Sequence, residues 1–266
     1  MGRTLRYTVN CSLLFTELPL LRRPAAARAA GFDAVEFWWP FDRPVPEDSE
    51  VAAFTAAVED AGVQLTGLNF FAGDMPGGER GVLSSPTRAA EFRDNIAVVV
   101  EIGHRLGTTG FNALYGLREP GVPAAESDAV AAESIAAAAE AVAAIGGTVL
   151  VEPVSGAPDY PLKTAADALR VVRAAHTVGA RNVALLADLF HLAANGDDVA
   201  AVVDAHAHEF GHIQIADHPG RGEPGTGTLP LDELLAAAQA RGYTGRVGLE
   251  YRPTGPTTES FARLPH

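Results

Sequence analysis

The sequence predicts an α/β protein of one domain, a closed (β/α)8 barrel that takes in residues 1–266. Short apolar runs alternate with alanine-rich segments of helical length along the whole chain. Eight such units fit into 266 residues, and no change of composition marks a domain boundary. Strands that alternate with helices pair in parallel through right-handed crossovers, and eight units favour closure over an open sheet.

The predicted strands are short runs of β-branched and other apolar residues. In chain order they are Leu5–Ser12, Ala34–Trp39, Leu65–Phe70, Gly110–Leu114, Thr148–Val154, Val183–Phe190, His212–Asp217 and Arg246–Tyr251.

Length and alanine content predict helices between these strands, among them Pro86–Leu106, Ala124–Ile145, Ala165–Val178 and Leu231–Arg241. Glycine stands where several predicted helices give way to the next strand. It accepts the left-handed backbone conformation that closes a helix. These glycines are Gly31, Gly62, Gly107, Gly146 and Gly242.

Two segments are predicted to be long loops, residues 40–50 and residues 71–86. The second is long and rich in glycine for a plain connection, which indicates a functional loop. The last dozen residues, 255–266, are predicted to form a loose tail or a docking segment for a partner.

Composition narrows the class of protein. The chain has 20 basic and 33 acidic residues, a net charge of −13, which argues against nucleic acid as a partner. Its one cysteine, Cys11, excludes a disulfide framework or a thiolate zinc site within the chain and is expected in the core. The opening residues lack a signal pattern and no apolar run reaches the ~18 residues of a membrane span, so we expect a cytoplasmic location without membrane contact.

Polar residues break the apolar pattern at the ends of four consecutive predicted strands. They are Glu152, Asp188, Gln214 and Glu250. In a barrel of this kind the active site lies at the carboxyl ends of the strands. Isolated buried carboxylates are costly, and oxygen ligands suit Mg2+ or Mn2+, so a shared cation explains the group better than four separate salt bridges or helix caps.

Two more residues are candidates for binding a substrate. Arg221 lies in the glycine-rich loop 218–227 after the seventh strand, where a guanidinium can clamp a carboxylate. His191 follows Asp188 by three positions and either contacts the substrate, orients an acid or is an ordinary half-buried loop histidine.

Other conspicuous side chains favour plainer roles. The alternating spacing of His206, His208 and His212 favours a solvated face over a metal site. Trp38, Trp39 and Phe71 are expected to line a pocket, form a contact in a homo-oligomer or belong to the core.

Several segments together resemble the hydroxypyruvate isomerase family of xylose isomerase-like barrels, over nearly the whole length. These segments are Asn10–Phe15, Gly31–Phe37, Gly78–Gly81, Gly211–Asp217, Arg221–Gly227 and Gly245–Tyr251 with Pro253 after it.

The resemblance implies that Glu152 and Glu250 are the acid/base pair and that Asp188 and Gln214 complete a metal site with them. It implies isomerisation of hydroxypyruvate to 2-hydroxy-3-oxopropanoate through an enediolate. The chain departs from the wider group at Gln214, where sugar isomerases and epimerases usually have histidine. It also departs at the Glu152–Ala157 turn, where the family has a Glu-Pro-Ile-Asn type sequence.

Four other functions are weighed against this one. A 2-oxo-tetronate isomerase of the same group would act on a four-carbon 2-oxo acid, and a ketose 3-epimerase would need no carboxylate clamp. The net charge of −13 argues against a metal-dependent endonuclease. A sugar-acid binding protein that had lost catalysis would lack one of the two glutamates, and both are present.

Overall fold

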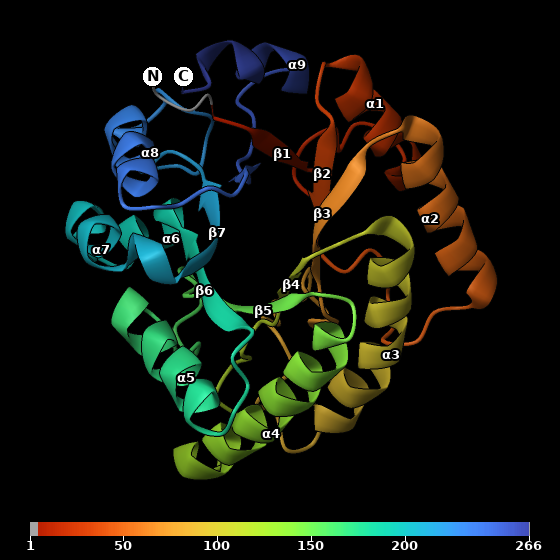
Figure 1. The fold of residues 1–266 in the computed structure, drawn as a ribbon, viewed down its shortest axis with the longest axis vertical. Helices are drawn as coiled ribbons and strands as arrows, with labels where there is room; N and C mark the ends of the chain where they lie inside the picture. The colour runs from red at the N-terminus through yellow and green to blue at the C-terminus, as the bar shows by residue number, and fades with distance from the viewer. Residues whose placement is uncertain (1–4, 266) are drawn as a thin grey trace.

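Eight parallel strands form a closed barrel in which each strand pairs with its neighbours in sequence and β8 closes against β1 (Figure 1). The computed structural model describes residues 5–265. The strands are β1 (Tyr7–Asn10), β2 (Ala34–Phe37), β3 (Gln64–Asn69), β4 (Gly110–Asn112), β5 (Thr148–Val151), β6 (Val183–Asp188), β7 (Phe210–Ile215) and β8 (Val247–Leu249). The predicted fold is confirmed, while the prediction that the barrel takes in residues 1–4 and 266 lies outside the described residues.

Helices surround the barrel and return the chain from each strand to the next (Figure 1). They are α1 (Arg23–Ala29), α2 (Asp48–Ala61), α3 (Ala89–Leu106), α4 (Ala124–Ala143), α5 (Ala165–Thr177), α6 (Leu189–Ala194), α7 (Val199–His206), α8 (Leu231–Ala240) and α9 (Thr257–Ser260). Three short 3-10 turns, η1 (Leu20–Arg22), η2 (Ala207–Glu209) and η3 (Phe261–Arg263), complete the described elements.

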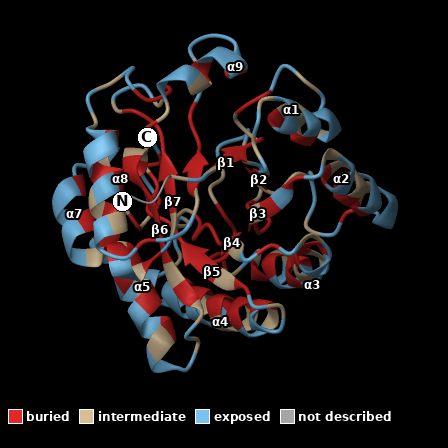
Figure 2. Ribbon diagram, turned by 45° about the horizontal axis from the view of Figure 1, so that its top comes forward, coloured by how far each residue is buried: buried red, intermediate tan, exposed pale blue. Residues whose placement is uncertain are grey.

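The main core lies between the strands and the helices. Val9, Val35 and Ile213 on the strands are completely buried. The helices bury one side against them and expose the other (Figure 2). Burial of apolar surface on this scale dominates the stability of the fold. The interior of the barrel is different, because several of its side chains are polar.

Local capping explains where several helices begin and end. Gly62 and Gly107 follow α2 and α3 with φ angles of 64° and 67°, in the left-handed region predicted for them. Glu47 and Glu50 form a reciprocal capping box at the start of α2. The prediction of a loop over residues 40–50 is therefore wrong at its end, because this cap starts the helix at Asp48.

The last residues form an ordered segment that packs on the barrel's own surface, so the prediction of a loose tail is wrong. The Phe261 ring packs 4.7 Å from the Phe32 ring, and the backbone N–H of Phe15 donates to Thr257 Oγ1 over 3.0 Å. The Tyr7 hydroxyl donates to the carbonyl of Pro265 over 2.6 Å. These contacts tie the end of the chain to its beginning.

Residues 71–86 contain no helix or strand, as predicted. The loop lies against the segment after β4, where a Cβ atom at Gly81 would lie 2.0 Å from the carbonyl oxygen of Leu114. Only glycine allows so close an approach. Among the described residues, no helix has the length and apolar character needed to cross a membrane.

Candidate active site

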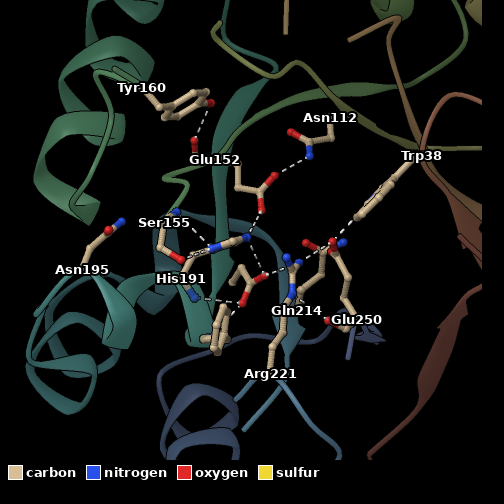
Figure 3. A network of polar contacts seen from close by, with 12 residues as sticks. Trp38, Asn112, Glu152, Ser155, Tyr160, His191, Asn195, Gln214, Arg221 and Glu250 are labelled. Atoms are coloured by element: carbon tan, nitrogen blue, oxygen red, sulfur yellow. Dashed lines mark hydrogen bonds and ion pairs between the residues drawn. The ribbon is translucent and has the colours of Figure 1, made fainter. Parts of the chain in front are cut away.

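The four polar residues predicted at strand ends all lie toward the carboxyl end of the barrel, where Figure 3 labels Glu152, Gln214 and Glu250. Glu152 and Glu250 come directly after β5 and β8, Asp188 is the last residue of β6, and Gln214 lies in β7. All four are buried, with at most 4% of their surface exposed. The strand order places these side chains together.

Glu152 has a neutral hydrogen-bond partner. Asn112 Nδ2, at the end of β4, donates to its Oε2 atom over 2.7 Å. No hydrogen bond from a described residue reaches Oε1, which lies 3.9 Å from His191 Nε2. Burial, followed by repulsion from Asp188, raises the pKa of Glu152 to about 8 in the metal-free protein.

Glu250 has a charged partner as well as a neutral one. Its Oε1 atom accepts a hydrogen bond from Arg221 Nη2 over 2.9 Å and another from Trp38 Nε1 over 3.0 Å. Burial raises the pKa of Glu250 well above its usual range, and the Arg221 guanidinium opposes this shift. Within the described chain, no hydrogen bond uses Oε2 of Glu250, so this oxygen is available to a substrate or cation.

The two carboxylate oxygens of Asp188 differ in their hydrogen bonds. Oδ1 caps α6 by accepting the backbone N–H groups of Phe190 and His191, over 2.8 and 3.3 Å. Oδ2 is buried without a hydrogen-bond partner among the described residues. It lies 3.6 Å from His191 Nε2 and 3.7 Å from Arg221 Nη2. A buried carboxylate oxygen left unpaired in this way is a natural cation ligand.

The side-chain amide of Gln214 likewise has one atom that is hydrogen-bonded and one that is not. Its Nε2 atom donates to Glu36 Oε1 over 2.8 Å, while its Oε1 atom is buried without a partner in the described part of the chain. Asp188 and Gln214, which lie opposite each other on β6 and β7, therefore each leave one buried oxygen unsatisfied.

His191 is held by the turn after β5. The backbone N–H of Ser155 donates to His191 Nδ1 over 3.0 Å, and the Ser155 hydroxyl lies 2.7 Å from the same nitrogen. Burial lowers the pKa of His191 to about 4, so the ring is neutral near pH 7. Because Nδ1 accepts a backbone N–H, the proton resides on Nε2, which lies 3.6 Å from Asp188 Oδ2 and 3.9 Å from Glu152 Oε1, beyond hydrogen-bond distance.

Arg221 is held in place by the loop after β7. Its φ angle is 62°, an uncommon conformation for a residue with a side chain. The Asp217 carboxylate fixes this loop by accepting backbone N–H groups from His218, Gly225 and Leu229 over 2.8–3.0 Å. The guanidinium lies 5.4 Å from the centre of the Phe190 ring. Packing and hydrogen bonds thus direct the cation toward Glu250.

The residues present can hold a metal ion. Ligand atoms of Glu152, Asp188 and His191 lie within 4.8 Å of one another. The sequence prediction named Gln214 and Glu250 in place of His191. The protonated Nε2 atom of His191 favours the prediction, because a nitrogen that carries hydrogen has no lone pair for a metal. The unpaired oxygens of Asp188 and Gln214 also fit an oxygen-rich site.

Several contacts of the site were not predicted. Asn112 carries the same signal as the predicted residues, a polar side chain at a strand end, and could have been found by it. Ser155 stands in the turn noted as unusual, but nothing local indicates that it meets His191. The prediction of a solvated face is wrong for His212, whose side chain is 14% exposed and lies 2.7 Å from Glu36.

Comparison with known proteins decides the family. The model of the xylose isomerase-like TIM barrel family matches residues 24–265. A protein of Streptomyces coelicolor, whose name gives hydroxypyruvate isomerase as a provisional assignment, is 53% identical over 98% of this chain and 95% of its own length. The chain belongs to the hydroxypyruvate isomerase family of xylose isomerase-like barrels.

Two further relatives of the family are almost equally similar to the chain. The hydroxypyruvate isomerase of Escherichia coli is 33% identical, and the 2-oxo-tetronate isomerase of Cupriavidus necator is 34% identical, each over 97% of both chains. Among solved structures, a Brucella melitensis protein described as an AP endonuclease of family 2 has a TM-score of 0.87 and 31% identity, over 97% of both chains.

Proposed function

We propose that the protein is an isomerase that interconverts hydroxypyruvate and 2-hydroxy-3-oxopropanoate (tartronate semialdehyde) through an enediolate. The observation that carries this proposal is the pair of buried glutamates, Glu152 and Glu250, each with one oxygen free of hydrogen bonds from the described residues. Both have raised pKa values, as a group that exchanges protons with carbon near neutral pH requires.

The proposed cation ligands are Glu152, Asp188, Gln214 and Glu250, and Mg2+ or Mn2+ is the proposed ion. When bound, such an ion supplies positive charge that stabilises the oxygens of an enediolate. The support is the donor set, in which every ligand is an oxygen and two of these oxygens are otherwise unpaired.

His191 and Arg221 are the proposed substrate-binding residues. The Nε2–H group of His191 is too far from Asp188 and Glu152 for a hydrogen bond, at 3.6 and 3.9 Å, so it is free to donate to a substrate oxygen. Arg221 contributes a guanidinium that is already oriented by Glu250 and Phe190. A carboxylate bound beside this cation would stay in a fixed position during proton transfer.

The proposed reaction moves one proton between carbons and one between oxygens. One glutamate removes a proton from C3 of hydroxypyruvate, and the electrons of that C–H bond form the C2–C3 double bond of the enediolate. A glutamate then protonates C2, while the proton of the C3 hydroxyl passes to the C2 oxygen. The products balance, because an aldehyde at C3 and a hydroxyl at C2 replace a hydroxyl at C3 and a ketone at C2.

A 2-oxo-tetronate isomerase is the second candidate, because the Cupriavidus necator relative is as similar as the Escherichia coli one. The same glutamates would act on a substrate with one more carbon. A ketose 3-epimerase is less well supported, since Gln214 replaces the usual histidine. A nuclease is opposed by the net charge of −13, and a binding protein without catalysis by the presence of both glutamates.

We expect a small 2-oxo acid as the partner molecule, a cytoplasmic location and no nucleic acid or membrane partner. A homo-oligomer is compatible with the fold and is tested by sedimentation.

Proton NMR of hydroxypyruvate in D2O tests the function directly. Purified protein is mixed with substrate in the presence of EDTA, Mg2+ or Mn2+, with a sample lacking protein as the control. We expect deuterium at C3 and a new aldehyde-hydrate signal in the metal samples, and their loss with EDTA. Silence in every sample would remove hydroxypyruvate, and four-carbon 2-oxo acids and then neutral ketoses would be tested in its place.

A further inference from the structure

A further carboxylate, that of Glu36, lies inside the barrel in contact with Gln214 of the proposed metal site. Glu36 in β2 is 2% exposed, and three side chains donate to it. Gln214 Nε2 lies 2.8 Å and Asn10 Nδ2 lies 3.2 Å from its Oε1 atom, while His212 Nε2 lies 2.7 Å from Oε2. Glu36 was not assigned a role by any motif of the sequence.

The contact with Glu36 determines which end of the Gln214 amide faces the proposed site. A carboxylate accepts hydrogen bonds and cannot donate them, so the NH2 end of the amide must face Glu36. The oxygen and nitrogen of an amide point in directions about 120° apart by planar geometry. Oε1 of Gln214 therefore points away from Glu36, and it is buried without a hydrogen-bond partner among the described residues.

The barrel leaves room for this arrangement. A Cβ atom at Gly248 in β8 would lie 2.6 Å from Glu36 Oε1 and 2.8 Å from Gln214 Cγ. A Cβ atom at Gly67 in β3 would lie 3.2 Å from Glu36 Cβ. Any larger residue at position 248 would displace the carboxylate, the amide or both. The glycines on two other strands thus accommodate the pair.

We propose that Glu36 is a positioning residue that presents the carbonyl oxygen of Gln214, rather than its NH2 group, to the metal ion. The inference rests on the proposed function, which makes Gln214 a metal ligand. Glu36 touches neither substrate nor metal in this scheme and acts through Gln214. With Glu36 removed, the amide loses the partner that fixes it, and its donor end competes for the ligand position.

Mn2+ binding to EDTA-treated protein, followed by the EPR signal of free Mn2+, tests this role without measuring activity. Glu36→Met and Gln214→Met keep side-chain volume and remove one partner each. Thr8→Val is the matched control, because Thr8 is also completely buried but bonds to Thr66. We expect Glu36→Met to lower the melting temperature, because three donors lose their acceptor, and to weaken Mn2+ binding of the folded protein about 10- to 100-fold, whereas Thr8→Val leaves Mn2+ binding unchanged.

The double variant separates action through Gln214 from an independent effect. If Glu36 acts through Gln214, the double variant binds Mn2+ about as weakly as Gln214→Met alone. Wild-type affinity in Glu36→Met beside weak binding in Gln214→Met would overturn this inference alone, as would losses that multiply in the double variant. Failure of the wild-type protein to bind Mn2+ would overturn the metal site of the proposed function together with it.

A measurement on wild-type protein keeps the inference testable if Glu36→Met does not fold. The side-chain NH2 signals of Gln214 in a 15N-labelled sample are assigned by their absence from the Gln214→Met spectrum. With Mg2+ bound, we expect the hydrogen that Nε2 donates to Glu36 to be protected from exchange with water because it remains directed at the carboxylate. Rapid exchange of both hydrogens in the Mg2+ complex would contradict the proposed orientation.

Discussion

Glu152 and Glu250 occupy equivalent places in the barrel but differ in what surrounds them. Each follows the last residue of a strand directly, and each is buried. Glu152 accepts its hydrogen bond from the neutral amide of Asn112, whereas Glu250 accepts from the Arg221 guanidinium and the Trp38 indole. The fold therefore offers two carboxylates at the same depth with different electrostatic environments.

This difference gives the two proposed proton carriers distinct surroundings. The pKa of Glu152 rises to about 8 because burial and Asp188 both disfavour its charge. The Arg221 guanidinium opposes burial at both glutamates; it is the main opposing cause at Glu250, whereas at Glu152 the hydrogen bond from Asn112 comes first. The neighbours of each glutamate, rather than the glutamates themselves, distinguish the two sides of the site.

Removing either carboxylate should have the largest effect. Glu152→Gln and Glu250→Gln each keep the shape of the side chain but cannot carry a proton, so we expect turnover to fall about 10⁴-fold, the upper range for an acid/base group. Melting curves of both variants serve as the control for folding. Near-normal activity in either variant would contradict its assignment, and loss of C3 exchange with D2O in only one would identify the glutamate that removes the first proton.

The raised pKa values of Glu152 and Glu250 make the stability of the metal-free protein depend on pH. Both glutamates bind protons more tightly in the folded metal-free protein than in the unfolded chain, where the usual value is 4.5. Stability of the metal-free protein is thus greatest at low pH in this window and falls as pH rises from about 4.5 through about 8.

Mn2+ needs the ionised carboxylates, so its affinity should rise with pH. Release of one proton from a group with a pKa of about 8 corresponds to an increase of about 50-fold between pH 6 and pH 8. Isothermal titration at several pH values, in buffers with different heats of ionisation, measures both the affinity and the protons released. An affinity that does not change with pH would show that neither glutamate is protonated before the metal binds.

The strands and the four strand-end residues could be predicted because their signal is local. A polar residue that ends an apolar run, such as Glu152 or Asp188, is visible in a few residues of sequence. Predicted strand ends extended too far, as in Gly110–Leu114 for β4 (Gly110–Asn112), because apolar residues continue beyond the last paired residue. Composition alone does not mark where the hydrogen-bonded ladder stops.

The partners of the site residues could not be predicted because they are distant in sequence. Trp38 donates to Glu250 across 212 positions, and Ser155 donates to His191 across 36. Glu36 was visible as a polar residue in a predicted strand, but its role depends on Gln214 on the other side of the barrel. Such contacts arise from closure of the sheet rather than from any pattern in one segment.

Replacing Arg221 by lysine tests the role of the charged neighbour of Glu250. Lys at this position keeps a positive charge but loses the planar fork that bonds Glu250 and stacks near Phe190. We expect kcat/KM for hydroxypyruvate to fall about 10- to 100-fold, corresponding to roughly 1.4–2.8 kcal/mol. A matched measurement with a neutral ketose distinguishes the functions, because an effect confined to the oxo acid assigns Arg221 to the carboxylate.

The smallest expected effects come from removing the neutral hydrogen-bond donor of each glutamate, Asn112 for Glu152 and Trp38 for Glu250. Asn112→Leu removes the only hydrogen bond that a described residue makes to the Glu152 carboxylate, whereas Trp38→Phe leaves Arg221 bonded to Glu250. A single hydrogen bond contributes about 0.5–1.5 kcal/mol, so we expect a loss of about tenfold in kcat/KM for Asn112→Leu and about threefold for Trp38→Phe.

The two variants should also differ in the pH dependence of kcat/KM. Because the Asn112 bond lowers the pKa of Glu152, its removal should raise that pKa and move the acidic limb of the pH profile to higher pH. Trp38→Phe should leave that limb in place, since Arg221 still sets the charge near Glu250. Equal shifts in the two variants would mean that the glutamates titrate as one unit and that their different neighbours do not separate their roles.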